Sequence, residues 1–210
     1  MIPFNIPPYT YDEQKYVEDA ISSHHICGDN NYTKKCQEIL EKKFGVPKIY
    51  LTTSGSSALE MACMLAGISF GDEVILPSYT FSSTANSIVL FGGIPVFVDI
   101  RPDTMNIDET KIESAITSKT KAIMVVHYAG IAAEMDTIME ISKKHNLIVI
   151  EDAAQVVNAK YKNKYLGTIG DFGCYSFHET KNYSMGEGGA ICINNTRYIF
   201  VFQVFFEKNL

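Results

Sequence analysis

The chain has 210 residues, of which 46% are hydrophobic and 20% charged, so a packed globular core is expected rather than intrinsic disorder. The formal net charge is −6 and the basic residues form no long cluster, which argues against a nucleic acid or a membrane as partner. Neither a signal peptide nor an apolar run of the roughly 18 residues that span a bilayer is present, and the cysteines lack CxxC spacing, so a cytoplasmic protein with reduced thiols is expected.

The first elements in chain order are two helices, a strand and a third helix. Polar-faced helices are predicted over residues 11–24 and 32–44, and the second ends at Gly45 as a helix stop should. A short strand over residues 50–52 leads into a helix over 58–66, which is apolar nearly all round and is therefore expected to be buried.

Apolar strands then alternate with helices as far as residue 193. Further strands are predicted over 74–76, 95–99, 122–126, 147–150, 172–176 and 189–193, and further helices over 82–91, 108–115 and 135–145. This alternation predicts an α/β fold with a mostly parallel sheet that helices cover on both faces. In such sheets ligands bind outside the carboxyl ends of the strands.

A glycine and several hydroxyls stand where the buried helix begins, in residues 53–57 (TSGSS). Gly55 would permit close backbone approach, and a helix N-terminus attracts anions, so the segment could cradle a phosphate. Ordinary capping of the helix by Ser54 explains the same residues. No GK[ST] sequence follows, which excludes a Walker loop.

A carboxylate and a lysine follow two of the predicted strands. Asp152 comes directly after residues 147–150, and Lys181 comes five positions after Ser176. Pyridoxal phosphate (PLP) needs an amine for its aldehyde and an anion for its pyridine nitrogen, and these residues could supply both. Taken alone, Asp152 could equally be a structural ion pair or a helix cap, and Lys181 a solvated surface charge.

Three aromatic or imidazole side chains could support such a site. Phe81 could stack on a planar ring, although core packing is the simpler interpretation. His127 and His178 could act as acids or bases, although satisfied structural histidines are more common. No His, Cys, Asp or Glu cluster has metal-ligand spacing, and no GxSxG sequence supports a serine hydrolase.

Together these blocks resemble the sugar aminotransferases of the DegT/StrS family. The resemblance extends over about residues 1–197 and rests on blocks at residues 2–4 (IPF), 53–56 (TSGS), 71–75 (GDEVI), 77–81 (PSYTF), 95–99 (PVFVD), 151–155 (EDAAQ), 176–182 (SFHETKN) and 186–189 (GEGG). It implies the three-layer type I PLP aminotransferase fold, L-glutamate as amino donor, a 4-keto-6-deoxy sugar nucleotide as acceptor, a role in surface polysaccharide synthesis, and a homodimer.

The resemblance also implies a role for each matching residue. Lys181 would link to the cofactor's aldehyde and then move a proton between substrate and cofactor. Asp152 would pair with the pyridine nitrogen, Gln155 would hydrogen-bond near the ring's phenolic oxygen, and Phe81 would stack on the ring. The phosphate would be held by Gly55, Ser56, Ser57 and Ser176. No metal is implied.

The end of the chain departs from the family pattern. Residues 1–197 are assigned to an incomplete PLP-binding large domain, and 198–210 to an aberrant apolar tail, because residues 198–206 are aromatic, uncharged and β-prone. The family's small C-terminal domain is expected to be absent, so a truncated form with impaired turnover is expected. A non-catalytic PLP-binding fragment and a PLP-fold sugar-nucleotide dehydratase remain alternatives, although relatives that dehydrate carry histidine in place of Lys181.

Overall fold

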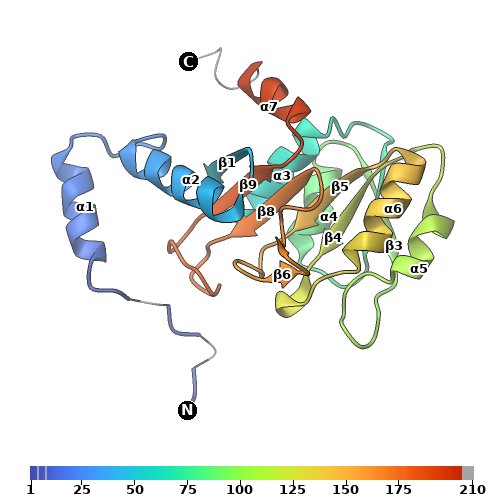
Figure 1. Ribbon diagram of the computed structural model, residues 1–210, viewed down its shortest axis with the longest axis horizontal. Helices are drawn as coiled ribbons and strands as arrows, with labels where there is room; N and C mark the ends of the chain where they lie inside the picture. Colours follow the sequence, from blue (N-terminus) through green and yellow to red (C-terminus); the bar gives the residue numbers. More distant parts are fainter. Residues whose placement is uncertain (4, 8, 205–210) are drawn as a thin grey trace.

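The computed structural model describes residues 1–3, 5–7 and 9–204, and a seven-stranded sheet forms its centre (Figure 1). The strand order is β1-β9-β8-β5-β4-β2-β3. The strands are β1 (Lys48–Thr52), β2 (Glu73–Pro77), β3 (Ile94–Val98), β4 (Thr120–Val126), β5 (Ile148–Asp152), β8 (Phe172–Ser176) and β9 (Gly189–Ile193). Strand β9 is antiparallel to both of its neighbours, and the other pairs are parallel, so the predicted mostly parallel sheet is confirmed.

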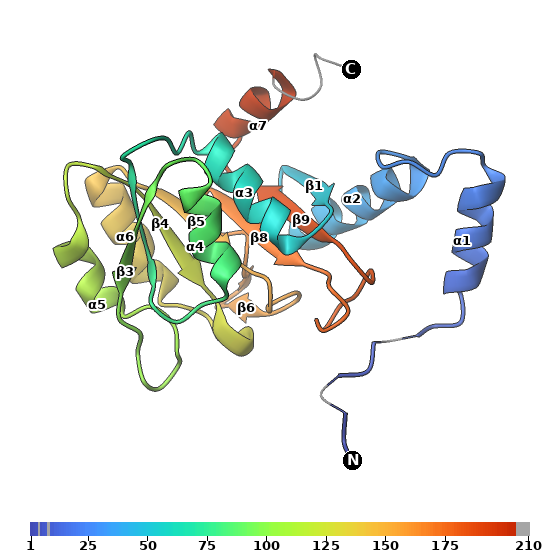
Figure 2. The same ribbon diagram turned by 180° about the vertical axis from the view of Figure 1, so that it is seen from behind.

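Helices cover both faces of this sheet. The helices are α1 (Glu13–Ser22), α2 (Asn31–Phe44), α3 (Gly55–Leu65), α4 (Ser82–Val89), α5 (Glu109–Ile112), α6 (Met135–His145) and α7 (Arg197–Phe202), with short 3-10 turns η1 (Glu113–Ala115) and η2 (Tyr128–Gly130). Helices α2, α5 and α6 lie on the face seen in Figure 1, whereas α3 and α4 lie on the face seen in Figure 2. The predicted three-layer arrangement is therefore present.

The period of two along each strand explains why both faces are apolar. In β4, Ala122 and Met124 pack in the core beneath α3 and α4, while Ile123 and Val125 pack in the core beneath α5 and α6. Successive side chains of a strand point to opposite faces, so a strand buried on both sides must be apolar at every position. The continuous apolar runs in the sequence follow from this burial.

Parallel strands place the functional segments at one edge. The carboxyl ends of β2, β4, β5 and β8 lie at the same edge of the sheet because these strands run in one direction. Strand β1 is parallel to β8 through their shared antiparallel neighbour β9, so the loop that leads into α3 reaches this edge as well. The fold thus gathers the predicted site segments.

Two features differ from expectation. A two-stranded hairpin, β6 (Lys160–Tyr161) with β7 (Lys164–Tyr165), has no counterpart among the predicted elements. The run that looks β-prone after residue 197 is helical in α7, where Phe202 stacks on Tyr50 with ring centroids 3.7 Å apart. Aromatic burial outweighs the β propensity there.

The remaining boundary predictions stay predictions. Residues 205–210 of the predicted tail, Pro8, and Phe4 of the first family block lie outside the described residues. The division into a domain and a tail at residue 197 is likewise untested. In the part of the chain that the structure describes, no helix combines the length and the apolar character needed to cross a bilayer.

Candidate active site

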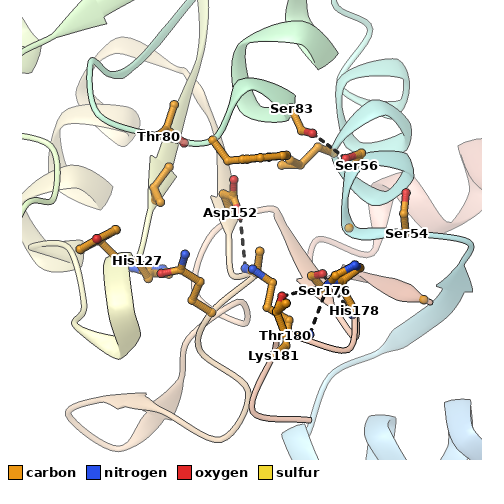
Figure 3. A pocket seen from close by; sticks show the side chains of 18 of the residues that line it. Ser54, Ser56, Thr80, Ser83, His127, Asp152, Ser176, His178, Thr180 and Lys181 are labelled. Atoms are coloured by element: carbon orange, nitrogen blue, oxygen red, sulfur yellow. Dashed lines mark hydrogen bonds between the residues drawn. The ribbon is translucent and has the colours of Figure 1, made fainter. Parts of the chain in front are cut away.

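A cavity of about 550 Å³ opens at the carboxyl edge of the sheet (Figure 3). Seven of the eight predicted site residues line it: Gly55, Ser56, Phe81, Asp152, Gln155, Ser176 and Lys181. The eighth, Ser57, is not among the lining residues, because its hydroxyl is turned to Thr53 Oγ1 at 3.1 Å and Ser54 Oγ at 3.0 Å. These seven residues come from four separate segments of the chain, which therefore meet in one space.

The start of helix α3 lies directly against the end of strand β8. A Cβ atom added at Gly55 would stand 2.8 Å from Ser176 Cβ, which is closer than real contacts allow, so only glycine fits without displacement. Ser54 caps the helix by accepting a hydrogen bond from the Ser57 N–H at 3.0 Å. The capping interpretation is thus correct. The first N–H groups of the helix beyond that cap remain available to an anion in the cavity.

The N-terminus of α4 meets that of α3 across the cavity. Ser83 Oγ on α4 lies 2.6 Å from Ser56 Oγ on α3. Two helix N-termini and two hydroxyls therefore border the same end of the cavity. Each terminus carries a partial positive charge, so this end favours a negatively charged group.

Asp152 ends strand β5 and is buried. Its Oδ2 accepts a hydrogen bond from Thr84 Oγ1 at 2.8 Å, and its Oδ1 accepts one from the Ala154 N–H at 3.2 Å. Burial raises the pKa of the carboxyl group, and the hydrogen bonds from Thr84 and Ala154 oppose that rise, as does the positive charge of Lys181. Among the described residues, no basic side chain donates a hydrogen bond to this carboxylate, so it is suited to a cationic N–H group of a ligand.

Glu151, the neighbour of Asp152, has a structural role. Its two oxygens accept hydrogen bonds from His127 Nε2 at 2.9 Å and from the N–H groups of Gly167, Ile169 and Gly170 at 2.6–2.7 Å. His127 Nδ1 accepts from the Ala133 N–H at 3.1 Å, so the proton sits on Nε2. Both groups are fully buried, and this supports the structural interpretation of His127.

Lys181 is the only lysine among the cavity-lining residues in the described part of the chain. It follows strand β8 in a turn, where its N–H donates to the His178 carbonyl at 2.9 Å. The side chain is half-buried and lies near Asp152 and Ser176 in Figure 3. A lysine amine, a buried carboxylate and an anion-binding helix end therefore border one cavity.

Gln155 and Phe81 complete the predicted set. Gln155 Oε1 accepts a hydrogen bond from the Ala129 N–H at 2.7 Å, which makes the amide nitrogen the end that can donate to a ligand. Phe81 lines the cavity just before α4 and is 74% exposed, so the core-packing interpretation is wrong for this residue. An exposed aromatic face at a cavity wall is available for stacking on a ring.

Several cavity residues escaped the sequence analysis. Ser83 lies in the hydroxyl run that follows the PSYTF block, and that run was a usable signal for a second polar helix start. Tyr79 and Tyr128 line the cavity with hydroxyl oxygens 3.3 Å apart, and no sequence pattern pairs them. Among the described residues, no group of three or more His, Cys, Asp or Glu side chains is arranged to hold a metal ion.

Comparison with known proteins gives consistent matches. Residues 8–205 match the model of the DegT/DnrJ/EryC1/StrS aminotransferase family. The GDP-perosamine synthase of Escherichia coli O157:H7 is 39% identical over 194 residues, which make up 92% of this chain and 53% of that protein. The chain spans about half the length of the curated relatives it matches.

Solved structures share the fold. A Streptococcus pneumoniae protein assigned as a sugar aminotransferase, in its PLP form, has a TM-score of 0.88 and 30% identity over 97% of this chain and 56% of its own. A GDP-4-keto-6-deoxymannose-3-dehydratase with a trapped PLP–glutamate geminal diamine has a TM-score of 0.89 and 27% identity over 96% of this chain and 53% of its own.

Proposed function

Because this chain belongs to the DegT/DnrJ/EryC1/StrS aminotransferase family, whose members use PLP, we propose that its cavity binds PLP and serves amino transfer to a sugar nucleotide. The observation that carries the proposal is the meeting of Lys181, Asp152 and the start of α3 in one cavity. The amine suits the aldehyde of the cofactor, the carboxylate suits its pyridine nitrogen, and the anion site at the helix start suits its phosphate.

The residues present fit this cofactor. The Gly55–Ser176 contact and the two helix N-termini form a cradle for the phosphate, with hydroxyls from Ser56 and Ser176. Ser57 supports that cradle indirectly, because its N–H and hydroxyl are bonded to Ser54. Asp152 is buried, and its described hydrogen-bond donors are a hydroxyl and a backbone N–H, which leaves the carboxylate suited to a pyridinium N–H.

Each residue has one task in the proposed reaction. When bound, PLP supplies an aldehyde that takes up the amino group and a ring that withdraws electrons. Lys181 would hold the cofactor through its aldehyde and, as a free amine, would move a proton at the substrate carbon. Asp152 would keep the ring nitrogen protonated, Gln155 would donate its amide N–H near the ring oxygen, and Phe81 would cover one ring face.

We propose L-glutamate as donor and a dTDP-4-keto-6-deoxyhexose as acceptor, giving dTDP-4-amino-4,6-dideoxygalactose for surface polysaccharides such as enterobacterial common antigen. Residues 101–110 (RPDTMNIDET) and 126–130 (VHYAG) support this narrower assignment through their resemblance to the transaminase that makes this sugar. One relative is named GDP-perosamine synthase, so GDP is the alternative nucleotide that should be tested against dTDP.

The experiment separates the two half-reactions. The PLP-loaded chain is mixed with L-glutamate, and conversion of bound PLP to its amino form is followed by absorbance. Keto sugar nucleotides carrying dTDP or GDP are then added, and the products are identified by mass spectrometry. A dTDP-amino sugar supports the whole proposal, whereas loss of the 3-hydroxyl without gain of nitrogen would replace it with dehydration.

We also propose a cytoplasmic homodimer. The five cysteines are all free, which is consistent with a reducing compartment. Helix α1 contributes no buried residue and exposes Tyr16, Val17 and Ile21, which is consistent with a partner surface. Sedimentation equilibrium of the purified chain measures the mass, and a monomer at micromolar concentration would contradict the dimer.

A further inference from the structure

A tight turn, η2 (Tyr128–Gly130), follows strand β4, and its Tyr128 lines the cavity. Ala129 in this turn has a φ of 51°, and Gly130 has a φ of 89°. A left-handed conformation costs an alanine roughly 1–2 kcal/mol, so surrounding contacts must hold the turn in place.

Asn106 supplies contacts to both ends of the turn. Its Oδ1 accepts a hydrogen bond from the Tyr128 N–H at 2.8 Å, and its Nδ2 donates to the Ile131 carbonyl at 3.0 Å. The residue is 1% exposed and does not line the cavity, so it acts from behind the wall. Its own carbonyl accepts from the Arg101 N–H at 2.8 Å, which anchors the loop that carries it.

The η2 turn also orients the side chain of Gln155, which lines the cavity. The Ala129 N–H donates to Gln155 Oε1 at 2.7 Å, and Ala129 lies between the two points that Asn106 holds. This bond decides which end of the Gln155 amide is the oxygen and leaves Nε2 as the donor. If the turn relaxed, the Gln155 amide would lose the contact that fixes its orientation.

We propose that Asn106 is a positioning residue for the cavity, acting through the Tyr128–Gly130 turn on the amide of Gln155. This inference rests on the proposed function, because it takes PLP as the ligand that faces Gln155. Asn106 touches neither the ligand nor the cavity, and its contribution is the fixed geometry of the turn. A buried amide that bridges a backbone N–H and a backbone carbonyl has a donor and an acceptor in use at once, and no aliphatic side chain reproduces this.

A matched control separates positioning from general stability. Asn194 also uses its amide to hold a turn, because Nδ2 donates to the Gly167 and Gly170 carbonyls at 3.1 and 3.0 Å. That turn does not line the cavity. Asn106→Ala and Asn194→Ala therefore remove comparable hydrogen bonds, and both are expected to lower the thermal midpoint.

Only Asn106 should affect the ligand. PLP affinity is measured by titrating the cofactor-free protein and following its fluorescence. Asn106→Ala is expected to bind PLP about tenfold more weakly, the size expected when a buried hydrogen-bond partner is lost, whereas Asn194→Ala keeps the affinity of the unaltered chain. If Asn106→Ala does not fold, Asn106→Asp takes its place. This variant keeps the acceptor for Tyr128, removes the donor to Ile131 and is also expected to weaken PLP binding.

A double-mutant cycle tests the route through Gln155. If Asn106 acts through this amide, Asn106→Ala combined with Gln155→Ala binds PLP no more weakly than Gln155→Ala alone. Losses that multiply, or an equal loss in Asn194→Ala, would overturn the proposal. Hydrogen exchange of the peptide over residues 127–133 in cofactor-free protein gives a readout that needs no PLP.

Different results would contradict the positioning role of Asn106 and the binding of PLP. Faster exchange in that peptide is expected for Asn106→Ala and not for Asn194→Ala. Unchanged exchange in Asn106→Ala would overturn the positioning role even if the chain binds PLP. Absence of PLP binding by the unaltered chain would instead overturn the proposed function, and with it the link from the turn to the cofactor.

Discussion

Thr84 Oγ1 donates a 2.8 Å hydrogen bond to Asp152 Oδ2 and so joins the first turn of α4 to the end of β5. Thr80 Oγ1 lies 2.7 Å from the same hydroxyl. The buried charge of Asp152 is thus stabilised by neutral dipoles rather than by a bonded cation. Its Coulomb attraction remains available to a ligand.

Removing the Thr84 hydroxyl should weaken this arrangement without changing the shape of the side chain. Thr84→Val is expected to destabilise the protein by about 1–3 kcal/mol, because a buried carboxylate loses a hydrogen-bond donor. Chemical denaturation measures the change. Thr84→Ser keeps the hydroxyl and serves as control, and a Thr84→Val variant as stable as the unaltered chain would show that the hydrogen bond to Asp152 contributes nothing.

Asp152 should lower the free energy of unfolding of the cofactor-free protein as the pH rises. Burial raises the pKa of this carboxyl group in the folded chain above its usual value of 3.8. The unfolded chain therefore releases the proton first, and stability falls from pH 3.8 upwards through the folded-state pKa. Asp152→Asn has no such loss. Without PLP it is expected to be at least as stable as the unaltered chain at about pH 7.

The same variant should bind PLP poorly. Asparagine retains the hydrogen-bonding shape of Asp152 and lacks its charge, so affinity is expected to fall by about 10-fold to 100-fold, the worth of a charge-assisted hydrogen bond. Urea denaturation at several pH values, paired with PLP titration, measures both effects. A variant that is less stable at neutral pH yet binds PLP normally would show that Asp152 is a structural carboxylate.

Gly55 should tolerate no side chain. In Gly55→Ala the new Cβ would stand 2.8 Å from Ser176 Cβ, and neither atom is the mobile end of a long side chain. The start of α3 must then move away from β8, with an expected cost of about 1–3 kcal/mol and a weaker phosphate site. Thermal unfolding and PLP titration measure the two effects.

Gly28 offers the control for this substitution. A Cβ at Gly28 would meet no atom of the described residues within 4 Å, so Gly28→Ala is expected to leave both stability and PLP affinity nearly unchanged. If Gly55→Ala matched Gly28→Ala in both measurements, the close contact between α3 and β8 would have no role in the cavity.

Periodicity and strand ends made most of the cavity predictable. Asp152 and Ser176 each stand at the end of an apolar strand, and a parallel sheet brings such ends together whatever the loops do. Gly55 was predictable because a glycine among hydroxyls at a helix start permits close backbone approach where the helix attracts anions. Lys181 needed the family resemblance, because a lysine beyond a strand is common.

Contacts between distant side chains were beyond the sequence. The bond between Thr84 and Asp152 joins residues 68 positions apart, and its geometry depends on how α4 packs on the sheet. Asn106 stands in a polar loop, and its burial arises only when the loop folds against the turn after β4. The helical form of α7 was missed because packing on Tyr50 outweighs the local preference of the aromatic run.

Lys181, as the residue that carries the cofactor, is the side chain on which the proposed function depends most. The purified chain is incubated with PLP, reduced with borohydride, digested and mapped by mass spectrometry. A pyridoxyl group is predicted on the peptide that contains Lys181, and none in Lys181→Ala. Absence of the adduct, or an equal spread over exposed lysines such as Lys160 and Lys164 of the β6–β7 hairpin, would contradict the proposed role of Lys181.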